Sequence, residues 1–311
     1  MTVSHNPVHI IVNPASAGGK TGRRMAEILS KIDRCYGKRY SLFVTQKSLQ
    51  AGDSASEAVR NGARLVIAVG GDGTLQEVVN GLFSNGHLMN PDCHLGIVCS
   101  GTGKGFAQSI GLPAAIQDQI ELIHEGHFRS VDIAKVHYRN REGVPSYRYY
   151  LNECQLGIGG AVVRNVQQNH KRLGGTLAFG LGTLETTFRY RNQSMTVTAN
   201  VEKHCFGRFT GIVIANGAYT GGGMNLTPGA RVDDGQLNVL LMHDLSIVQR
   251  LRVFPRIYSG SHVRSALFTH FKASTVTVES DEQVLVEADG ELLGTTPCTV
   301  KVLPSQLCVC I

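Results

Sequence analysis

The chain has 311 residues, of which 42% are hydrophobic and 17% are charged. This length is enough for two domains with buried cores, and no apolar run reaches the roughly 18 residues that cross a bilayer. The formal net charge of +6 and the pI of about 8.9 favour anionic partners such as nucleotides or anionic lipid surfaces. No lysine–arginine block is long enough to favour nucleic acid, so nucleic acid is not an expected partner.

The cysteines and the start of the chain indicate a reducing compartment. None of the eight cysteines forms a Cys-x-x-Cys pair, which argues against a zinc site. Most of them lie in apolar runs, where a free thiol packs as a small hydrophobic group. The segment from Met1 to Pro7 is polar and does not resemble a secretory leader. We therefore expect a cytoplasmic protein.

Strands and helices alternate in the first part of the chain. Short apolar runs predict strands at Val8–Val12, Tyr40–Val44, Val66–Val69 and Leu95–Cys99. Helical spacing of apolar residues follows each strand, beginning near Arg23, Ala51, Leu75 and Phe106, with a further helix from Ile116 to Ile123. This alternation predicts a parallel sheet covered on both faces, which binds ligands at the carboxyl ends of its strands.

Two glycine-rich turns lie at that edge of the predicted sheet. Gly70-Gly71-Asp72-Gly73-Thr74 follows the third strand, and Gly101 to Gly105 follow the fourth. The free N–H groups and the positive dipole end of a helix suit phosphate at such a junction. The Asp72 carboxylate would repel phosphate unless Mg²⁺ or a substrate hydroxyl accompanies it. For either motif alone, a plain capped turn remains the alternative.

The second part of the chain is mostly β. The predicted strands are Phe128–Tyr138, Ser146–Leu156, Met195–Val201, Phe209–Ala215, Leu237–Met242, Phe271–Glu279, Val284–Ala288, Thr299–Leu303 and Leu307–Ile311. Helical signal is confined to about Gly160–His170, Lys171–Thr187 and Leu245–Tyr258. These patterns predict a sandwich or an open barrel. We expect domains at 1–130 and 131–311 with a cleft between them, and a strand near 299–311 that packs back on the first domain.

Several motifs, in this order, resemble the diacylglycerol kinase catalytic-domain family, which includes soluble bacterial lipid kinases, sphingosine kinases and ceramide kinases. In the first half they are Ile11-Val12-Asn13-Pro14, Gly70 to Thr74 with Glu77 to Leu82, and Gly101-Thr102-Gly103. In the second half they are Gly221 to Met224, Pro228 to Leu237, and Asp289-Gly290-Glu291. The resemblance implies an NAD-kinase-like α/β nucleotide-binding domain followed by a β-sandwich-like domain, α/β + β overall.

Site residues follow from the same resemblance and from the predicted sheet edge. The expected nucleotide-binding residues are Asn13, Thr45, Gly70, Gly71, Asp72, Gly73, Thr74, Leu75, Gln76, Gly101 and Thr102. Arg231, Asp234 and Gln236 match a structural Mg²⁺ site of some bacterial members, in which two of the three act through their backbone carbonyls. We expect Glu291 to accept the proton of a lipid hydroxyl, Asp289 to be its neighbour or a metal partner, and Asp72 to be the rival base. Taken alone, both acidic segments are also typical of β-turns.

The chain departs from the family pattern at three places. Lys104-Gly105 replaces the usual Asn-Asp, Gln76 replaces Asn, and Gly160-Ala161 replaces Phe-Asp. In some sphingoid-base kinases that Asp contacts the acceptor hydroxyl, so Ala161 argues against a sphingoid acceptor. The cluster from His170 to Arg172 and the apolar stretch to Leu184 suit docking on an anionic membrane. A buried helix pair with a solvated basic start is the alternative.

The sequence therefore predicts an ATP- and Mg²⁺-dependent lipid kinase. Its expected substrate is a diacylglycerol-like or related lipid, met by a peripheral protein at a membrane surface, and a homodimer is an open expectation. Two alternatives remain: an NAD-kinase-like kinase of small molecules, and a catalytically silent homologue that binds nucleotide or lipid.

Overall fold

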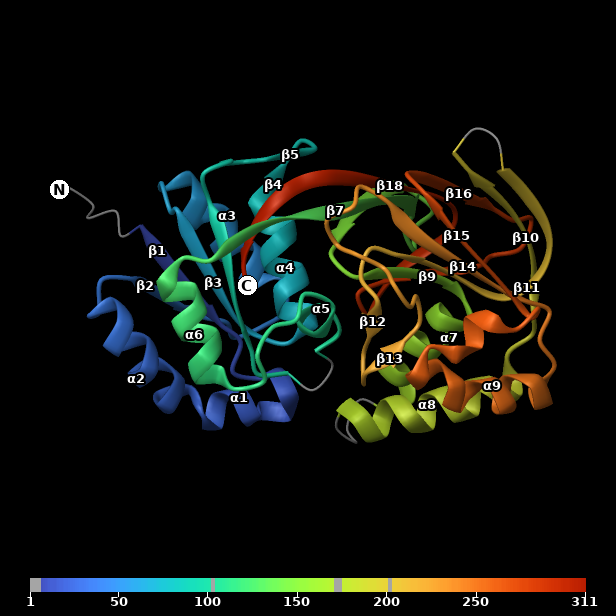
Figure 1. The fold of residues 1–311 in the computed structure, drawn as a ribbon, viewed down its shortest axis with the longest axis horizontal. Helices are drawn as coiled ribbons and strands as arrows, with labels where there is room; N and C mark the ends of the chain where they lie inside the picture. Colours follow the sequence, from blue (N-terminus) through green and yellow to red (C-terminus); the bar gives the residue numbers. More distant parts are fainter. Residues whose placement is uncertain (1–6, 102–103, 171–174, 201–202) are drawn as a thin grey trace. The chain divides into compact units, whose positions relative to one another are not determined.

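A computed structural model of the chain describes residues 7–101, 104–170, 175–200 and 203–311. The chain divides into two units (Figure 1). The first unit holds residues up to 131 together with 305–311, and the second unit holds residues 132–304. Within the described ranges, no helix is both long and apolar enough to cross a membrane.

The first unit is built on a parallel sheet. Its strands are β1 (Val8–Val12), β2 (Ser41–Val44), β3 (Leu65–Gly70), β6 (His94–Cys99) and the carboxyl end of β18 (Glu291–Cys310). They lie in the order β18-β6-β3-β1-β2, and every neighbouring pair is parallel. The α/β prediction for this part of the chain is confirmed.

Helices follow the strands of this sheet. They are α1 (Lys20–Arg23), α2 (Met25–Tyr36), α3 (Gln50–Arg60), α4 (Asp72–Leu82), α5 (Gly105–Ser109) and α6 (Ile116–Glu125). α2 and α6 bury isoleucines against β1, β3 and β6, because Ile28, Ile32 and Ile120 share one cluster with Ile10 and Ile67. A short hairpin, β4 (Phe83–Ser84) and β5 (His87–Leu88), follows α4.

The second unit is an antiparallel β structure. Its strands are β7 (Phe128–Arg139), β8 (Pro145–Tyr150), β9 (Glu153–Gly157), β10 (Gln193–Ala199), β11 (Lys203–Ala215), β14 (Leu237–His243), β15 (Phe268–Ala273), β16 (Thr275–Glu279), β17 (Leu285–Ala288) and most of β18, with a small hairpin of β12 (Tyr219–Thr220) and β13 (Met224–Asn225). The pairings β11–β10–β16–β18–β17–β9–β11 form a closed circuit. The circuit closes because β11 pairs with β10 up to Phe209 and with β9 from Gly211 onward.

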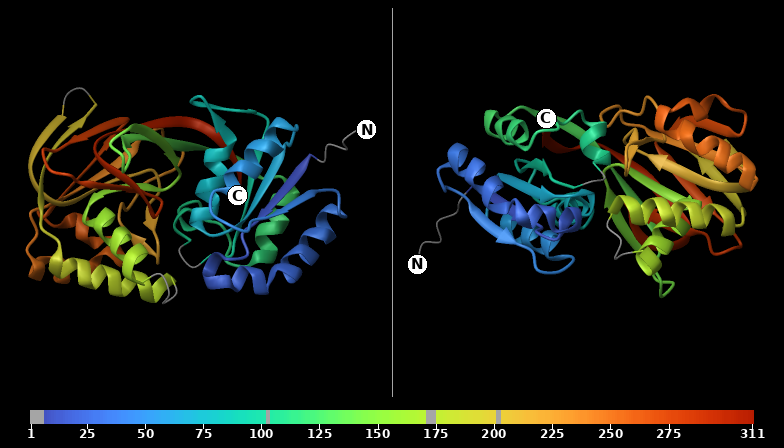
Figure 2. Two further views of the ribbon diagram at one scale, coloured as in Figure 1. Left: turned by 180° about the vertical axis from the view of Figure 1, so that it is seen from behind. Right: turned by 90° about the horizontal axis from the view of Figure 1, so that it is seen from below.

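Helices cover one face of the second unit. They are α7 (Ile158–Asn165), a π-helical turn (Val166–His170), α8 (Gly175–Arg189), α9 (Ile247–Ser259) and a 3₁₀ turn (Ser261–Arg264). α8 and α9 are in contact, and the right panel of Figure 2 shows both on the same face of this unit. The amino end of α9 has a capping box, in which Ser246 and Gln249 each bond the backbone of the other.

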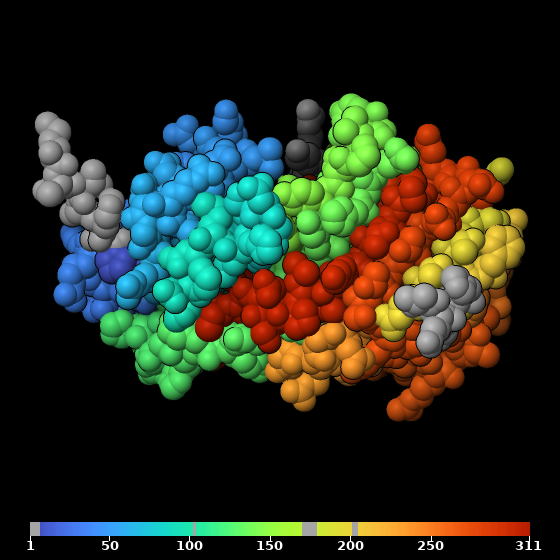
Figure 3. Space-filling model, turned by 90° about the horizontal axis from the view of Figure 1, so that it is seen from above, coloured from blue at the N-terminus to red at the C-terminus, as the bar shows by residue number. Residues whose placement is uncertain are grey.

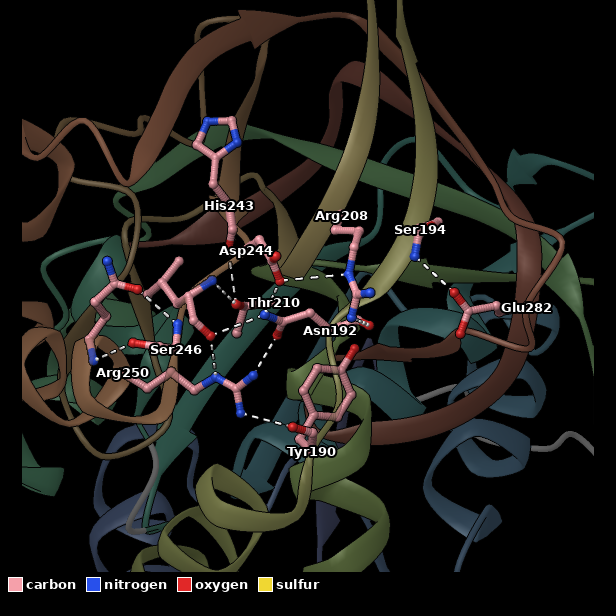
Figure 4. Close-up of polar contacts among 12 residues, drawn as sticks. Tyr190, Asn192, Ser194, Arg208, Thr210, His243, Asp244, Ser246, Arg250 and Glu282 are labelled. Atoms are coloured by element: carbon pink, nitrogen blue, oxygen red, sulfur yellow. Dashed lines mark hydrogen bonds and ion pairs between the residues drawn. The ribbon is translucent and has the colours of Figure 1, made fainter.

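A buried arginine on α9, Arg250, fixes the end of α8 (Figure 4). Its guanidinium donates to the carbonyl oxygens of Thr187 at 2.9 Å, Tyr190 at 3.0 Å and Leu245 at 3.2 Å, and to Asn192 Oδ1 at 2.5 Å. The carbonyl groups in the last turn of a helix have no partner within the helix and carry its negative dipole end. Arg250 therefore holds the carboxyl end of α8 against α9.

Three strand breaks in the second unit were predicted wrongly. The expected strand 146–156 is interrupted at Leu151 and Asn152, whose N–H groups bond the Asp289 carboxylate instead of a neighbouring strand. The expected strand 271–279 is two strands, since β15 pairs with β14 and β16 pairs with β10. The expected strands 299–303 and 307–311 are parts of one strand, because β18 runs on through Pro304, with Ser305 at a φ of 52° (Figure 1). Figure 3 shows residues near the carboxyl end of the chain (red) on the molecular surface.

Candidate active site

The strand ends of the first unit bring most of the predicted nucleotide-binding residues to one edge. Val12 is in register with Val44 and Val69, and Gly70 is in register with Cys99. The residues that follow stay tied to the sheet: the N–H of Thr45 donates to the Val12 carbonyl at 2.9 Å, and that of Asn13 donates to the Val69 carbonyl at 3.0 Å. Parallel pairing therefore places Asn13, Thr45, the 70–76 stretch and Gly101 at the carboxyl end of the sheet. Thr102 lies outside the described residues.

The turn after β3 is open to an anion. Helix α4 begins at Asp72, earlier than the apolar spacing predicts, and its N-cap is Gly71, whose backbone is extended. Because glycine carries no capping side chain, the N–H groups of the first turn of α4 remain available to a ligand. A Cβ atom at Gly101 would stand 2.7 Å from the Gly71 Cα atom. Only glycine lets the two loops approach this closely.

Asn13 and Thr74 are bonded to each other. Asn13 Nδ2 donates to Thr74 Oγ1 at 2.9 Å, and Asn13 Oδ1 accepts the N–H of Ala15 at 3.0 Å. Thr74 is buried. A second tie crosses the same edge, where the hydroxyl groups of Thr21 and Ser100 lie 2.7 Å apart. These side chains hold the loops after β1, β3 and β6 in place, so we assign Asn13 and Thr74 a positioning role.

Asp72 is a half-buried carboxylate at the start of α4. Its Oδ2 accepts the N–H of Gly105, the second residue of the departure from the family pattern, at 3.5 Å. Burial raises the pKa of Asp72, and hydrogen bonds from the backbone of Gly105 and Phe106 partly oppose that rise. Lys104 is the N-cap of α5 with a φ of 52°. A carboxylate oxygen beside open N–H groups fits a hard cation that travels with phosphate.

In the second unit, the predicted catalytic acids lie at the tight turn of a β-hairpin. Asp289 and Gly290 join β17 to β18 and have φ angles of 47° and 82°, which suit a two-residue β-turn. The Asp289 carboxylate accepts three N–H groups: Leu151 at 2.9 Å, Asn152 at 3.1 Å and Glu153 at 3.1 Å. Asp289 therefore anchors the turn to the segment before β9. Glu291 follows as the first residue of β18, and its side chain is exposed.

Sequence reasoning missed two buried acids next to this turn. Glu287 is 1% exposed, and its Oε2 accepts the N–H of Gly290 at 2.9 Å. Burial raises the pKa of Glu287 to about 8, and the charges of Asp289 and Glu291 add to the rise. Glu153 is also buried, with a hydrogen bond from the Thr220 hydroxyl. Strand alternation gave no signal for Glu287, because both faces of β17 are covered: Val286 and Ala288 belong to the hydrophobic core, and α7 packs against β17.

The buried Glu287 makes stability depend on pH. The folded chain keeps a proton on Glu287 that the unfolded chain releases, so stability falls as pH rises from the ordinary value of 4.5 to about 8. Over this pH range, we expect the free energy of unfolding of Glu287→Gln to fall by roughly 2–4 kcal/mol less than that of the wild type. Urea unfolding of both proteins across this pH range measures it. Parallel stability–pH curves for the two proteins would contradict the assignment.

The predicted metal residues lie in the turn before β14. Asp234 is paired with Lys272, since Asp234 Oδ2 and Lys272 Nζ are 2.6 Å apart. Arg231 is paired with Asp233, with 3.2 Å from Nε to Oδ1. Gln236 donates its backbone N–H to Asp234 Oδ1 at 3.1 Å. Across the described part of the chain, no group of three or more His, Cys, Asp and Glu side chains could hold a metal ion.

A cavity of about 420 Å³ lies beside α7 and α8 in the second unit. Ala161 lines this cavity. Its methyl group therefore stands where the family pattern has the Asp of Phe-Asp. The polar wall is internally bonded: Asn165 Nδ2 donates to Glu185 Oε2 at 3.1 Å, and Glu185 pairs with Arg189 at 2.6 Å. This cavity is a candidate site for the polar part of an acceptor.

A parallel sheet with a glycine-rich turn at its edge, followed by an antiparallel β unit, defines the class of the protein: an NAD-kinase-like fold. An NAD kinase from Archaeoglobus fulgidus in complex with ATP shares this fold, with a TM-score of 0.51 and 12% identity over 98% of this chain and 93% of that one. The model of the diacylglycerol kinase catalytic domain matches residues 7–136. The model of the YegS C-terminal NAD kinase beta sandwich-like domain matches residues 153–311. The chain belongs to the diacylglycerol kinase family, a family of lipid kinases.

Relatives support this membership over nearly the whole length. A diacylglycerol kinase of Staphylococcus carnosus is 27% identical over 292 residues, which cover 93% of this chain and 89% of the relative. The diacylglycerol kinase of Bacillus subtilis is 26% identical over 289 residues, covering 93% and 90%. The crystal structure of a putative diacylglycerol kinase from Bacillus anthracis str. Sterne has a TM-score of 0.78 and 23% identity, covering 98% and 97%. The last comparison concerns the fold alone.

Proposed function

We propose that this lipid kinase transfers the γ-phosphoryl group of ATP to the hydroxyl of a diacylglycerol-like lipid. The observation that carries the proposal is the open turn from Gly70 to Thr74, where Gly71 and Gly101 meet and α4 begins. Backbone N–H groups at such a helix start bind phosphate oxygens. The family membership supplies the lipid acceptor, and the diacylglycerol kinases named above support that class of lipid.

The residues of the first unit fit a nucleotide that carries Mg²⁺. Asp72 offers carboxylate oxygens beside the phosphate-binding turn, and oxygen is the ligand that Mg²⁺ prefers. The bound cation would neutralise the charge that develops on the phosphates. In this assignment Thr45, Leu75 and Gln76 belong to the nucleotide-binding edge, and Asn13 and Thr74 hold its loops in position.

The second unit contains the candidate group that accepts the proton of the lipid hydroxyl. Asp289 is held by three backbone donors, so its oxygens are occupied within the protein. Glu291 is exposed and follows the anchored turn directly. We therefore assign Glu291 as the group that accepts the hydroxyl proton, and Asp289 as the residue that orients the turn. Asp72 remains the rival base.

The experiment is a phosphorylation assay with the purified full chain, labelled ATP and Mg²⁺. The acceptors are dioleoylglycerol in mixed micelles, a total lipid extract, and NAD. We expect label in the lipid fraction, and loss of labelling when a chelator removes the metal. Label in NAD alone would replace the proposal with the NAD-kinase alternative. ATP binding by calorimetry without turnover on any acceptor would favour the silent homologue.

We also propose that an apolar face of α8 and α9 docks this unit on an anionic membrane. Three α8 side chains are exposed at helical spacing, Leu181 by 41%, Leu184 by 51% and Phe188 by 54%. On α9, the exposed apolar residues are Ile247, Val248 and Leu251. Monomeric proteins rarely leave such a face uncovered, and apolar groups beside cations suit the surface of a bilayer.

The charges around this face favour anionic lipid. Helix α9 carries exposed Arg252 and Arg256 and has no acidic residue in its sequence. The acid of α8, Glu185, is paired with Arg189, whose side chain is 79% exposed. Basic residues near an anionic surface contribute about 1 kcal/mol each. Lys171 and Arg172, which the sequence also assigned to this surface, lie outside the described residues.

Vesicle sedimentation tests the membrane proposal. We expect the chain to bind phosphatidylglycerol vesicles more strongly than phosphatidylcholine vesicles, and to bind less at high salt. The double variant Leu184→Ser, Phe188→Ser should bind at least about tenfold more weakly, since two apolar side chains leave the bilayer. Phe206→Ser is the matched control, because Phe206 is 80% exposed on β11. Equal losses in the two variants would contradict docking through α8 and α9.

A further inference from the structure

The turn that precedes β14 is tied to strand β7 by its backbone. Asp132 of β7 is 1% exposed, and its N–H donates to the Val232 carbonyl at 2.6 Å. Asp132 Oδ2 in turn accepts the N–H of Gly235 at 2.7 Å. These two bonds fix the turn on both sides of Asp234. The position of the Asp234 side chain is therefore set by the fold of the second unit.

Both oxygens of Asp234 have partners within the protein. Oδ1 accepts the N–H of Gln236 at 3.1 Å, and Oδ2 lies 2.6 Å from Lys272 Nζ. Lys272 stands on β15 directly opposite Asn238 of β14, so the sheet holds its backbone next to the turn. The side chain of Asp234 is 18% exposed and that of Lys272 is 42% exposed. The β14–β15 pairing thus fixes the backbone position from which the Lys272 ammonium group contacts the Asp234 carboxylate.

This arrangement does not fit a divalent cation. Mg²⁺ requires near-octahedral oxygen ligands at about 2.0–2.1 Å. The Lys272 ammonium carries three donors and no acceptor, and it already lies at the carboxylate oxygen that a metal would use. A divalent cation at the same oxygen would also be repelled by the ammonium charge.

We propose that Lys272 is the built-in counter-ion of the 231–236 turn, so that the second unit needs no structural divalent cation there. The ammonium supplies at Asp234 the positive charge that the resemblance assigns to Mg²⁺ in some bacterial relatives. The pair is intramolecular, so it forms with the β14–β15 pairing and does not depend on metal concentration. This inference does not rest on the kinase activity, and its test uses no turnover.

The first test follows metal binding and thermal unfolding of the full chain without nucleotide. Mn²⁺ serves as the probe, through the relaxation of water protons. We expect the wild-type protein to have the same Tm in Mg²⁺ and in a chelator. We also expect that Asp234→Asn removes no saturable Mn²⁺ site from the protein. A wild-type Mn²⁺ site that is lost in Asp234→Asn would overturn the proposal.

Variants of Lys272 provide the second test. Lys272→Met keeps the length of the side chain and removes its charge, so its Tm in chelator should fall by about 2 °C. Millimolar Mg²⁺ should then restore part of that loss, and Asp234→Asn in the same protein should abolish the restoration. Lys272→Arg should retain the wild-type behaviour, and Lys301→Met controls for loss of an exposed lysine on another strand. An unchanged Tm for Lys272→Met in chelator would show that the ammonium contributes nothing.

Discussion

Glu291→Gln is expected to lower kcat by about 10²–10⁴-fold, the range that general acid–base groups contribute. Glutamine keeps the size of the side chain but cannot accept a proton from the lipid hydroxyl. The affinity for ATP should stay unchanged, because the residues that we propose to bind the nucleotide belong to the first unit. A lipid phosphorylation assay gives kcat, and calorimetry gives the dissociation constant of ATP.

The control for this variant is Glu279→Gln, which neutralises an exposed glutamate at the end of β16 in the same unit. It should leave kcat unchanged. Asp72→Asn separates the two candidate bases. If Glu291→Gln retains full kcat while Asp72→Asn abolishes it with ATP still bound, the proton acceptor is Asp72 and the assignment of Glu291 is wrong.

Asp289→Asn is expected to lower both stability and activity. The carboxylate accepts three backbone N–H groups, and an asparagine would turn an NH₂ group toward one of them. Hydrogen bonds to a charged group contribute more than neutral ones, so the free energy of unfolding should fall by about 2–3 kcal/mol. Because the turn that carries Glu291 loses its anchor, kcat should also fall, by about 100-fold.

Urea unfolding and kinetics on the same preparation check this prediction. Asp281→Asn is the matched control, since Asp281 is an exposed aspartate in the segment between β16 and β17. Its unfolding free energy and kcat should match those of the wild type. Wild-type stability in Asp289→Asn would mean that the three donors find equal partners without the carboxylate, and the anchoring role would be refuted.

Local sequence patterns were sufficient to predict the structure of a segment where one kind of interaction dominates. The β-branched runs of the first unit form parallel strands because both faces of each strand are covered, and that burial is written into consecutive apolar residues. The Gly70–Thr74 turn was also readable, because glycine at such a junction has few explanations. The strand breaks in the second unit do not follow from local patterns. There, the breaks at Leu151 and Ser274 depend on partners more than seventy residues away.

The candidate site shows the same division. Asp289 and Glu291 could be singled out from the sequence, but their different roles could not. The sequence does not show that three N–H groups from residues 151–153 converge on one carboxylate. Glu287 was missed because a glutamate in a strand is ordinarily expected to point to solvent. Its burial depends on α7, a distant helix that packs against β17.

By itself, the sequence determined the order of elements, the glycine-rich turn at the end of β3, and the family. These features depend on neighbours along the chain, where hydrophobic periodicity and glycine positions act directly. The tertiary structure alone decided which acid is anchored, which acid is buried, and that Lys272 lies against Asp234. Each of these depends on charges and hydrogen-bond donors from distant segments. Their energies are set by distance and burial in the folded chain, and no local pattern encodes either quantity.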